Sequence, residues 1–147
     1  MIVCLQRVSS AQVSVQETIV GHIGKGFLIL LGVEKPDTEV QAKRLVEKIV
    51  FFRVFEDSAG KMNLSIQDVA GSILVVSQFT LVGSTAKGRR PSFENAALPE
   101  QARQLYQCFV DELKQRSIPV ETGVFGAMMD ITLVNNGPVT FILEDKA

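Results

Sequence analysis

The sequence contains few of the side chains on which common enzyme chemistry depends. Its 147 residues include one histidine, two cysteines, one tyrosine and no tryptophan. A site with two histidine ligands is therefore excluded, and Cys4 and Cys108 do not have the spacing of a zinc site. A Ser-His-Asp triad would have to use His22, whose surroundings are more typical of an exposed strand or turn histidine.

Several motifs and long segments are also absent. The sequence contains neither a G-x-x-x-x-G-K-S/T phosphate loop nor a G-x-S-x-G nucleophile elbow. It shows no apolar run of membrane-spanning length, and no basic region followed by an apolar stretch as in a signal peptide. The two cysteines are interpreted as reduced thiols, which are typical of the cytoplasm, so we expect a cytoplasmic protein. Because no membrane-spanning run is present, we expect no membrane contact.

The charge balance limits the partners further. The net charge is −1, whereas a protein that coats nucleic acid non-specifically needs many cations to neutralise phosphates. Any contact with nucleic acid must therefore come from a local patch, and we expect no DNA partner. Hydrophobic residues make up 46% and charged residues 21%, the balance of a soluble globular protein, and the length fits one domain over residues 1–147.

Apolar periodicity predicts the fold class. Alternating or continuous apolar runs predict strands at 2–8, 12–16, 19–23, 27–33, 51–55, 72–78, 119–125, 129–135 and 139–143. A bend or bulge is expected at Ser9 and Ser10. One helix is expected to begin near Thr38, which has capping-box spacing with Gln41, and a second at Pro99. The sequence therefore predicts one α+β domain, a mostly antiparallel, barrel-like sheet with two amphipathic helices packed on it.

Two segments at strand ends contain more special residues than packing requires. At 77–81 (SQFTL), a buried strand ends in two hydroxyls, an amide and an aromatic ring, where main-chain N–H groups can point at a ligand. The alternative is an ordinary strand end with satisfied hydroxyl groups. At 135–140 (NNGPVT), Asn-Gly-Pro between two apolar strands is typical of a plain hairpin turn, and Pro138 adds the option of a cis peptide bond.

A third segment, GSTAKGRRPSF at 83–93, belongs to a non-periodic loop expected over 83–97. Lys87, Arg89 and Arg90 form a compact group of cations with small residues around it. Such a loop can lie against phosphates, and the alternative interpretation is a solvated basic loop.

The segments SQFTL and NNGPVT resemble the two signature motifs of the D-aminoacyl-tRNA deacylase family. Four further segments are similar to that family: MIVCLQRVSSAQVSV at 1–15, GKMNLS at 60–65, GRRPSF at 88–93 and FGAMM at 125–129. The resemblance covers the whole chain, and both motifs in this order make it specific. It implies a hydrolase that cuts the ester between a D-amino acid and the end of a tRNA.

The same resemblance implies a homodimer that completes each site across its interface. Gly137 and Pro138 of one subunit, joined by a cis peptide bond, would enter the pocket of the other. Their carbonyl groups would accept hydrogen bonds from the α-ammonium of the substrate. A main-chain wall would reject L-residues whatever their side chain, which is chiral proofreading. Glycine has no side chain to exclude, so glycyl-tRNA, mischarged on tRNA-Ala, should be cleaved too.

By the same resemblance, the SQFTL segment would form the ester-facing side of the pocket. The main-chain N–H groups of Phe79 and Thr80 would stabilise the oxyanion, and the Phe79 ring would pack on the terminal adenosine. Ser77 and Gln78 would hold the strand end and the pocket wall. Arg7 would fix the Gly-Pro loop by hydrogen bonds to its carbonyl groups.

A nucleophilic role for Thr80 is not expected, because neither a suitable histidine nor a lysine lies nearby to serve as its base. The 2′-OH of the terminal ribose would instead position or activate water. We expect no metal and no cofactor. Two other classes stay open: a non-catalytic tRNA- or nucleotide-binding module, and a small-molecule esterase with a Thr or Ser nucleophile.

Overall fold

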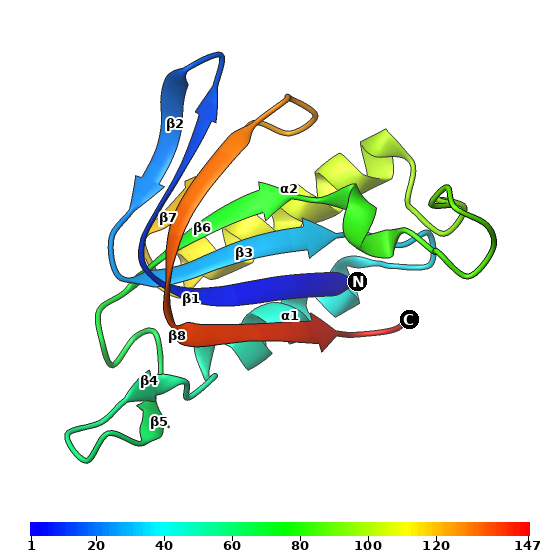
Figure 1. The fold of residues 1–147 in the computed structure, drawn as a ribbon. Helices are drawn as coiled ribbons and strands as arrows, with labels where there is room; N and C mark the ends of the chain where they lie inside the picture. Colours follow the sequence, from blue (N-terminus) through cyan, green and yellow to red (C-terminus); the bar gives the residue numbers. More distant parts are fainter.

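A six-stranded mixed sheet forms the centre of the structure, a computed structural model that describes residues 1–147 (Figure 1). Its strands are β1 (Ile2–Val15), β2 (Thr18–Ile23), β3 (Gly26–Gly32), β6 (Ser72–Ser77), β7 (Val120–Thr122) and β8 (Asp130–Glu144). β1 pairs antiparallel with β2, β3 and β8, whereas β3 pairs parallel with β6, and β6 with β7. β4 (Phe55–Glu56) and β5 (Met62–Leu64) form a separate antiparallel pair. The predicted α+β class is confirmed.

β1 is a single strand, whereas the alternation pattern predicts two. Its register against β8 shifts on both sides of Val8, and the second shift confirms the bulge expected beside Ser9 and Ser10. An inserted residue moves the following side chains to the other face of the sheet. Leu5 therefore faces the main core, whereas Val13 faces a smaller apolar cluster on the opposite side.

β8 is also a single strand, and this corrects the hairpin interpretation of 135–140. Asn135 and Thr140 both pair with β1, so the two apolar halves share one partner and do not pair with each other. Residues 136–139 bulge out between them, opposite Arg7. A hairpin turn is therefore replaced by a loop that projects from the middle of one strand.

Two further strand predictions are too long. Of the segment predicted as a strand at 51–55, only Phe55 is extended, at the start of β4, because α1 continues to Val50 and the chain at 52–54 is irregular. Phe51 caps that helix, with its N–H bonded to the Glu47 carbonyl. The strand predicted at 119–125 is limited to β7.

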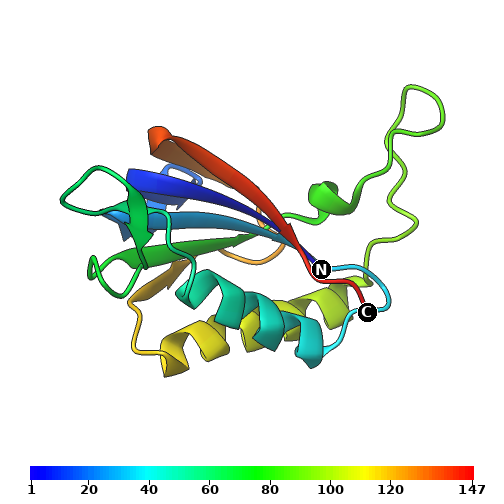
Figure 2. The ribbon, with the colours of Figure 1, turned by 90° about the horizontal axis from the view of Figure 1, so that it is seen from below.

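Two helices, α1 (Glu39–Val50) and α2 (Pro99–Gln115), cover one face of the sheet (Figure 2). The predicted capping box is present: the Thr38 hydroxyl accepts from the Val40 N–H, and the Gln41 side chain accepts from the Thr38 N–H. Pro99 occupies the first turn of α2, as predicted. Neither helix is long and apolar enough to cross a membrane.

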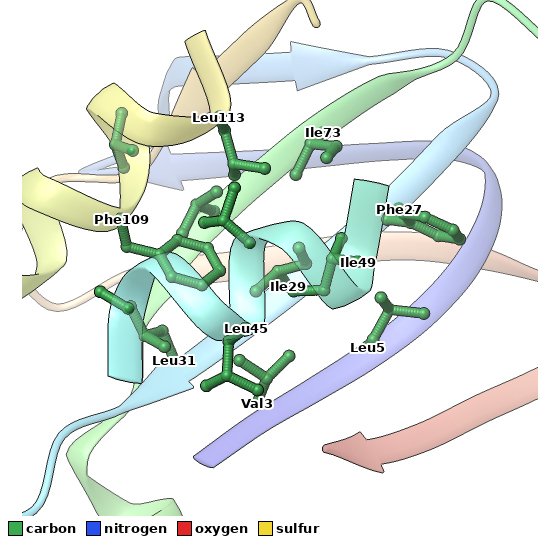
Figure 3. Packing of buried hydrophobic residues seen from close by; sticks show 14 of the residues in the cluster. Val3, Leu5, Phe27, Ile29, Leu31, Leu45, Ile49, Ile73, Phe109 and Leu113 are labelled. Atoms are coloured by element: carbon green, nitrogen blue, oxygen red, sulfur yellow. The ribbon is translucent and has the colours of Figure 1, made fainter. Parts of the chain in front are cut away.

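The main core lies between the helices and the sheet (Figure 3). Leu45 of α1, Phe109 and Leu113 of α2 and Ile29 of β3 belong to one buried cluster. Each such side chain contributes about 1.5–3 kcal/mol when it is fully buried. This layer fixes the parallel strands β3 and β6, whose carboxyl ends carry the candidate site.

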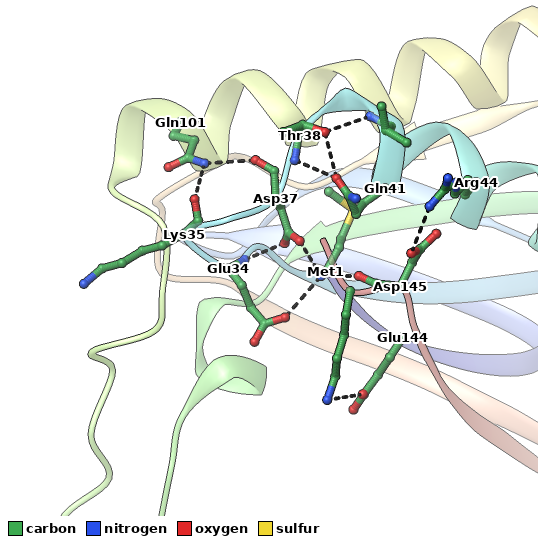
Figure 4. A network of polar contacts seen from close by, with 12 residues as sticks. Met1, Glu34, Lys35, Asp37, Thr38, Gln41, Arg44, Gln101, Glu144 and Asp145 are labelled. Atoms are coloured by element: carbon green, nitrogen blue, oxygen red, sulfur yellow. Dashed lines mark hydrogen bonds and ion pairs between the residues drawn. The ribbon is translucent and has the colours of Figure 1, made fainter.

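The amino terminus is anchored in a buried polar network (Figure 4). The Met1 α-ammonium donates to the Asp37 carboxylate at 2.7 Å, to the Asp145 carbonyl at 2.8 Å and to the Glu34 carboxylate at 3.2 Å. The Asp37 carboxylate also accepts the Glu34 N–H. Gln101 of α2 donates to two carbonyl groups of the same segment. The network therefore ties β1, the chain after β3 and α2 together.

We expect Asp37→Asn to lower the free energy of unfolding by about 2 kcal/mol. The Met1 ammonium and the Asp37 carboxylate are both fully buried, and the remaining carboxylate of Glu34 compensates the charge only in part. Urea unfolding at neutral pH measures the effect, with Glu144→Gln, an exposed carboxylate beside Lys146, as the control. A change below about 0.5 kcal/mol would show that the pair contributes no more than a surface ion pair.

Candidate functional site

The parallel strands direct their loops to one end of the sheet, where ligands commonly bind. Leu31 of β3 pairs with Ser77 of β6, so the carboxyl ends of these strands lie side by side. A pocket of about 660 Å³ opens there. Its wall is formed by residues from β3, β6, β8, α2 and the intervening loops: Leu31, Val33, Val76, Ser77, Gln78, Phe79, Thr80, Ala96, Ala97, Pro99, Ala102, Phe125, Gly126, Ala127, Met128, Met129 and Ile131.

The SQFTL segment turns sharply at the pocket. The Gln78 N–H still bonds to the Leu31 carbonyl, and a 3-10 turn, η1 (Phe79–Val82), follows at once. Within it, the Leu81 N–H bonds to the Gln78 carbonyl. The first N–H groups of a helical turn have no partner inside the turn. The N–H groups of Phe79 and Thr80 accordingly have no acceptor in the chain and are available to a ligand.

The pocket wall contains no ionisable side chain. The Thr80 hydroxyl accepts a hydrogen bond from the Gln78 side-chain amide, which cannot remove its proton. His22 lies exposed on β2, paired with Gln12, and does not line the pocket. The structure also holds no group of three or more His, Cys, Asp or Glu side chains that could bind a metal ion. The polar groups at the pocket are therefore main-chain amides, hydroxyls and one side-chain amide.

Four of the seven residues predicted for catalysis or substrate binding meet in this pocket, and three do not. Ser77, Gln78, Phe79 and Thr80 all line it. Gly137, Pro138 and Arg7 do not line it. Ile131 of β8 does, and Gly137 follows six residues later, in the projecting loop, a separation of up to roughly 20 Å. In one chain, the two signature segments lie apart.

Arg7 holds the projecting loop of β8. Its guanidinium donates to the Asn136 carbonyl at 2.8 Å and to the Val54 carbonyl at 2.6 Å, and the side chain is almost fully buried. On the other side, the Asn135 side chain accepts the Val139 N–H at 2.8 Å and donates to the Val139 carbonyl at 3.2 Å. These bonds replace the strand pairing that the loop lacks. The expected hydrogen bond from Arg7 to the loop is present.

The tip of this loop has an unusual backbone. The Gly137-Pro138 peptide bond is cis, and Gly137 has φ +152°, a conformation that L side chains rarely adopt. Both residues are exposed. An added Cβ at Gly137 would lie 2.6 Å from the Val139 Cγ2 atom and 2.8 Å from its nitrogen. Glycine is therefore the residue that this position accepts without rearrangement.

The basic loop borders the pocket through an aromatic contact. The Phe93 ring packs edge-on against the Phe79 ring, with centroids 5.0 Å apart. Lys87, Arg89 and Arg90 are exposed and form no ion pair. The loop extends away from the body of the molecule (Figure 2). The three cations therefore lie on an exposed loop that touches the pocket wall through the contact of Phe93 with Phe79.

Sequence reasoning missed part of the pocket wall. The FGAMM segment at 125–129, which follows β7, lines the pocket, and so do Ala96 and Ala97. The sequence indicates a family resemblance for FGAMM but no place in the site. The sequence shows only that the segment follows a predicted strand; the parallel pairing of that strand, which returns the chain to the same end of the sheet, comes from the structure.

Tyr106 supports this wall from behind. Its hydroxyl donates to the Val75 carbonyl at 2.9 Å, and its ring packs on Phe125 with centroids 5.7 Å apart. Burial raises the pKa of Tyr106 to about 12. The phenol therefore stays protonated at neutral pH and is a structural group, not a base.

The family model for D-Tyr-tRNA(Tyr) deacylase matches residues 4–144. The chain belongs to the D-aminoacyl-tRNA deacylase family. Similar proteins named D-aminoacyl-tRNA deacylase come from Geobacter sulfurreducens, 58% identical over 97% of this chain and 94% of the relative, and from Persephonella marina, 56% identical over 100% and 99%. By family the chain is an enzyme, a hydrolase that acts on the ester bond of aminoacyl-tRNA.

Two solved structures are similar to this D-aminoacyl-tRNA deacylase family member. A "c-Myc DNA Unwinding Element Binding Protein" has a TM-score of 0.95 and 40% identity over the full length of both chains. A structure described as "Structural Analysis of a probable eukaryotic D-amino acid tRNA deacylase" has a TM-score of 0.83 over 97% of each chain. At 18% identity, the second likeness concerns the fold alone.

Proposed function

We propose that this deacylase hydrolyses D-aminoacyl-tRNA by main-chain catalysis, in a pocket completed by the Gly137-Pro138 tip of a second subunit. One observation carries the catalytic part: two N–H groups without an acceptor, those of Phe79 and Thr80, stand at a pocket that has no ionisable side chain. Such a site can polarise and position an ester, although it offers no side chain as a general base.

The reaction needs little more than this. Water attacks the ester carbonyl carbon, and the negative charge that develops on the carbonyl oxygen is stabilised by the N–H groups of Phe79 and Thr80. The bond to the ribose oxygen then breaks, which releases the D-amino acid and a free tRNA end. The neighbouring 2′-OH of the ribose positions the water and relays one of its protons to the departing ribose oxygen. Ser77 and Gln78 keep the strand end and the pocket wall in place.

The need for a second subunit follows from the distance within one chain. The Gly137-Pro138 tip does not line its own pocket: six residues of β8, a length of up to roughly 20 Å, separate Gly137 from Ile131, and pairing with β1 holds that part of β8 in place. It is exposed, and Arg7 and Asn135 hold it rigidly. In a two-fold symmetric dimer, each tip can enter the other subunit's pocket. There its carbonyl groups accept hydrogen bonds from the substrate ammonium.

Chiral selection is then a matter of shape. A main-chain wall held on both sides leaves no room for the side chain of an L-residue, whichever side chain that is. Glycyl-tRNA, mischarged on tRNA-Ala, passes this wall because glycine has no side chain. We place the reaction in the cytoplasm, in keeping with two free cysteines.

A side-by-side deacylation assay with D-tyrosyl-, L-tyrosyl- and glycyl-tRNA tests the proposed function. The D-tyrosyl and glycyl esters should be hydrolysed, and the L-tyrosyl ester should keep its spontaneous half-life. A non-catalytic tRNA-binding module would protect all three esters or leave them unchanged. A small-molecule esterase would hydrolyse simple esters without tRNA and form an acyl-enzyme visible by intact-mass measurement.

The Thr80 side chain should matter little. We expect Thr80→Ala to lower kcat by no more than about tenfold, because the hydroxyl makes one hydrogen bond, to Gln78, and no base adjoins it. Single-turnover deacylation of D-tyrosyl-tRNA measures the effect. Loss of all activity in a folded Thr80→Ala protein would restore Thr80 as the nucleophile and contradict main-chain catalysis.

The basic loop is the proposed contact to tRNA, and the exposed Phe79 ring the proposed platform for the terminal adenosine. Replacing Arg89 and Arg90 with glutamine should weaken tRNA binding and flatten its salt dependence by up to about 1.8 in the slope of log K against log salt. Lys61 and Lys114, exposed and outside the pocket wall, provide a charge-matched double variant. Equal slopes in the two double variants would show that the loop faces solvent.

A further inference from the structure

The pocket rim carries the most exposed methionine of the chain. Met128 is 91% exposed and lines the pocket together with Met129. The other two methionines differ in surroundings: Met62 is 51% exposed on β5 and outside the pocket wall, and Met1 is fully buried. A single subunit therefore presents one exposed thioether at the pocket rim and a second one, Met62, away from the pocket.

The neighbouring methionine is held more tightly. Met129 is half-buried and packs beside the smaller apolar cluster of the sheet. Its sulfur lies against Gly123, where an added Cβ would come within 2.7 Å of it. An attacking oxidant reaches a thioether only from its open side, so Met128 is the better target of the two.

The two cysteine thiols are expected to react slowly with peroxide. Burial raises the pKa of the Cys4 thiol, and burial followed by the charge of Glu39 raises that of Cys108. The thiolate is the form that reacts with peroxides, and a raised pKa reduces its share at neutral pH. Neither cysteine lines the pocket.

We propose that Met128 is a peroxide-oxidation site whose sulfoxide slows deacylation. The sulfur attacks one peroxide oxygen, the O–O bond breaks, an S–O bond forms, and the second oxygen leaves as water. Sulfur loses two electrons and the peroxide gains them. The product carries a strongly polar S–O group at the rim of a wall made largely of Leu, Val, Ala, Phe and Met side chains. This inference rests on the proposed deacylation at this pocket.

Exposure to hydrogen peroxide should lower kcat/KM for D-tyrosyl-tRNA by about tenfold, the scale for a polar sulfoxide that loses its water when substrate covers the pocket rim. The loss should follow the addition of one oxygen to the peptide that contains Met128. Dithiothreitol, which reverses thiol oxidation, should not restore activity, whereas methionine sulfoxide reductases should.

Three variants test which methionine is responsible for the loss of activity. The activity of each variant after peroxide treatment is compared with that of the same variant without treatment. Met128→Leu should resist peroxide, whereas Met62→Leu and Met129→Leu should lose activity as the unmodified protein does. Protection by Met129→Leu instead, or equal loss in Met128→Leu, would overturn the assignment. If untreated protein fails to deacylate D-tyrosyl-tRNA, the proposed function fails. If it deacylates but stays active while Met128 is oxidised, only the inference about Met128 fails.

Discussion

Phe79→Pro is expected to lower kcat for D-tyrosyl-tRNA by about 10²–10³ relative to Phe79→Ala, the cost of one oxyanion-hole donor. Both variants remove the aromatic ring, so the comparison isolates the N–H group. Proline fits the backbone here: residue 79 is the first of η1, its N–H has no acceptor in the chain, and Gln78 before it is not helical. The substitution therefore removes the proposed oxyanion donor without removing an internal hydrogen bond.

Single-turnover rates at saturating enzyme measure kcat without the contribution of the ring to binding. Circular dichroism and thermal unfolding of both variants serve as the control for folding. If Phe79→Pro and Phe79→Ala react at the same rate, the Phe79 N–H does not stabilise the oxyanion, and the Thr80 N–H or a group of the tRNA must do so alone.

Gly137→Ala is expected to lower kcat/KM for D-tyrosyl-tRNA by about 10²-fold, the scale of a displacement near 1 Å in a positioning group. The new methyl group would lie 2.6 Å from the Val139 side chain, in a backbone conformation with positive φ, so the tip must shift. A shifted wall also leaves more room for an L-side chain. The ratio of D-tyrosyl to L-tyrosyl hydrolysis should therefore fall.

Gly60→Ala is the matched control, because Gly60 has φ +74° and nothing within 4 Å of its position for a Cβ. It also has a positive φ, on the turn between β4 and β5, without crowding and outside the pocket wall. Rates for both tyrosyl esters should stay unchanged in Gly60→Ala. An equal loss of activity in the two variants would mean that Gly137 acts only through stability.

Much of the fold could be predicted because local pattern and tertiary structure agree. The capping box at Thr38 and the proline at position 99 mark both helix starts correctly. The apolar runs that became β3 and β6 are buried on both faces, as continuous runs predict. Their parallel pairing was not visible, because the partner of a buried strand is set by its connections and not by its side chains.

The hairpin interpretation of 135–140 failed for a physical reason. Asn-Gly-Pro has the same turn preferences in a hairpin and in a bulged loop, so composition cannot separate the two. The difference lies in β1, which is long enough to pair with both halves of β8, and in Arg7, whose side chain occupies the space opposite the loop. A residue 129 positions away in sequence thus decides the local structure.

The sequence predicted the part of the candidate site that follows β6, but not the parts of the wall that come from other loops. Phe79 and Thr80 follow a recognisable strand end, and the structure places them at the pocket. Ala96, Ala97 and Ala127 have no special chemistry, and they line the pocket only because their loops return to one end of the sheet.

The central proposal is that one subunit supplies the pocket and another supplies the tip. Co-expression of Phe79→Pro and Gly137→Ala chains with different affinity tags allows isolation of the mixed dimer. One of its two sites would combine an unaltered pocket with an unaltered tip, so the mixed dimer should recover about half of the unmodified activity. Activity as low as in the parent variants, in a dimer shown to contain both chains, would contradict a site shared between subunits.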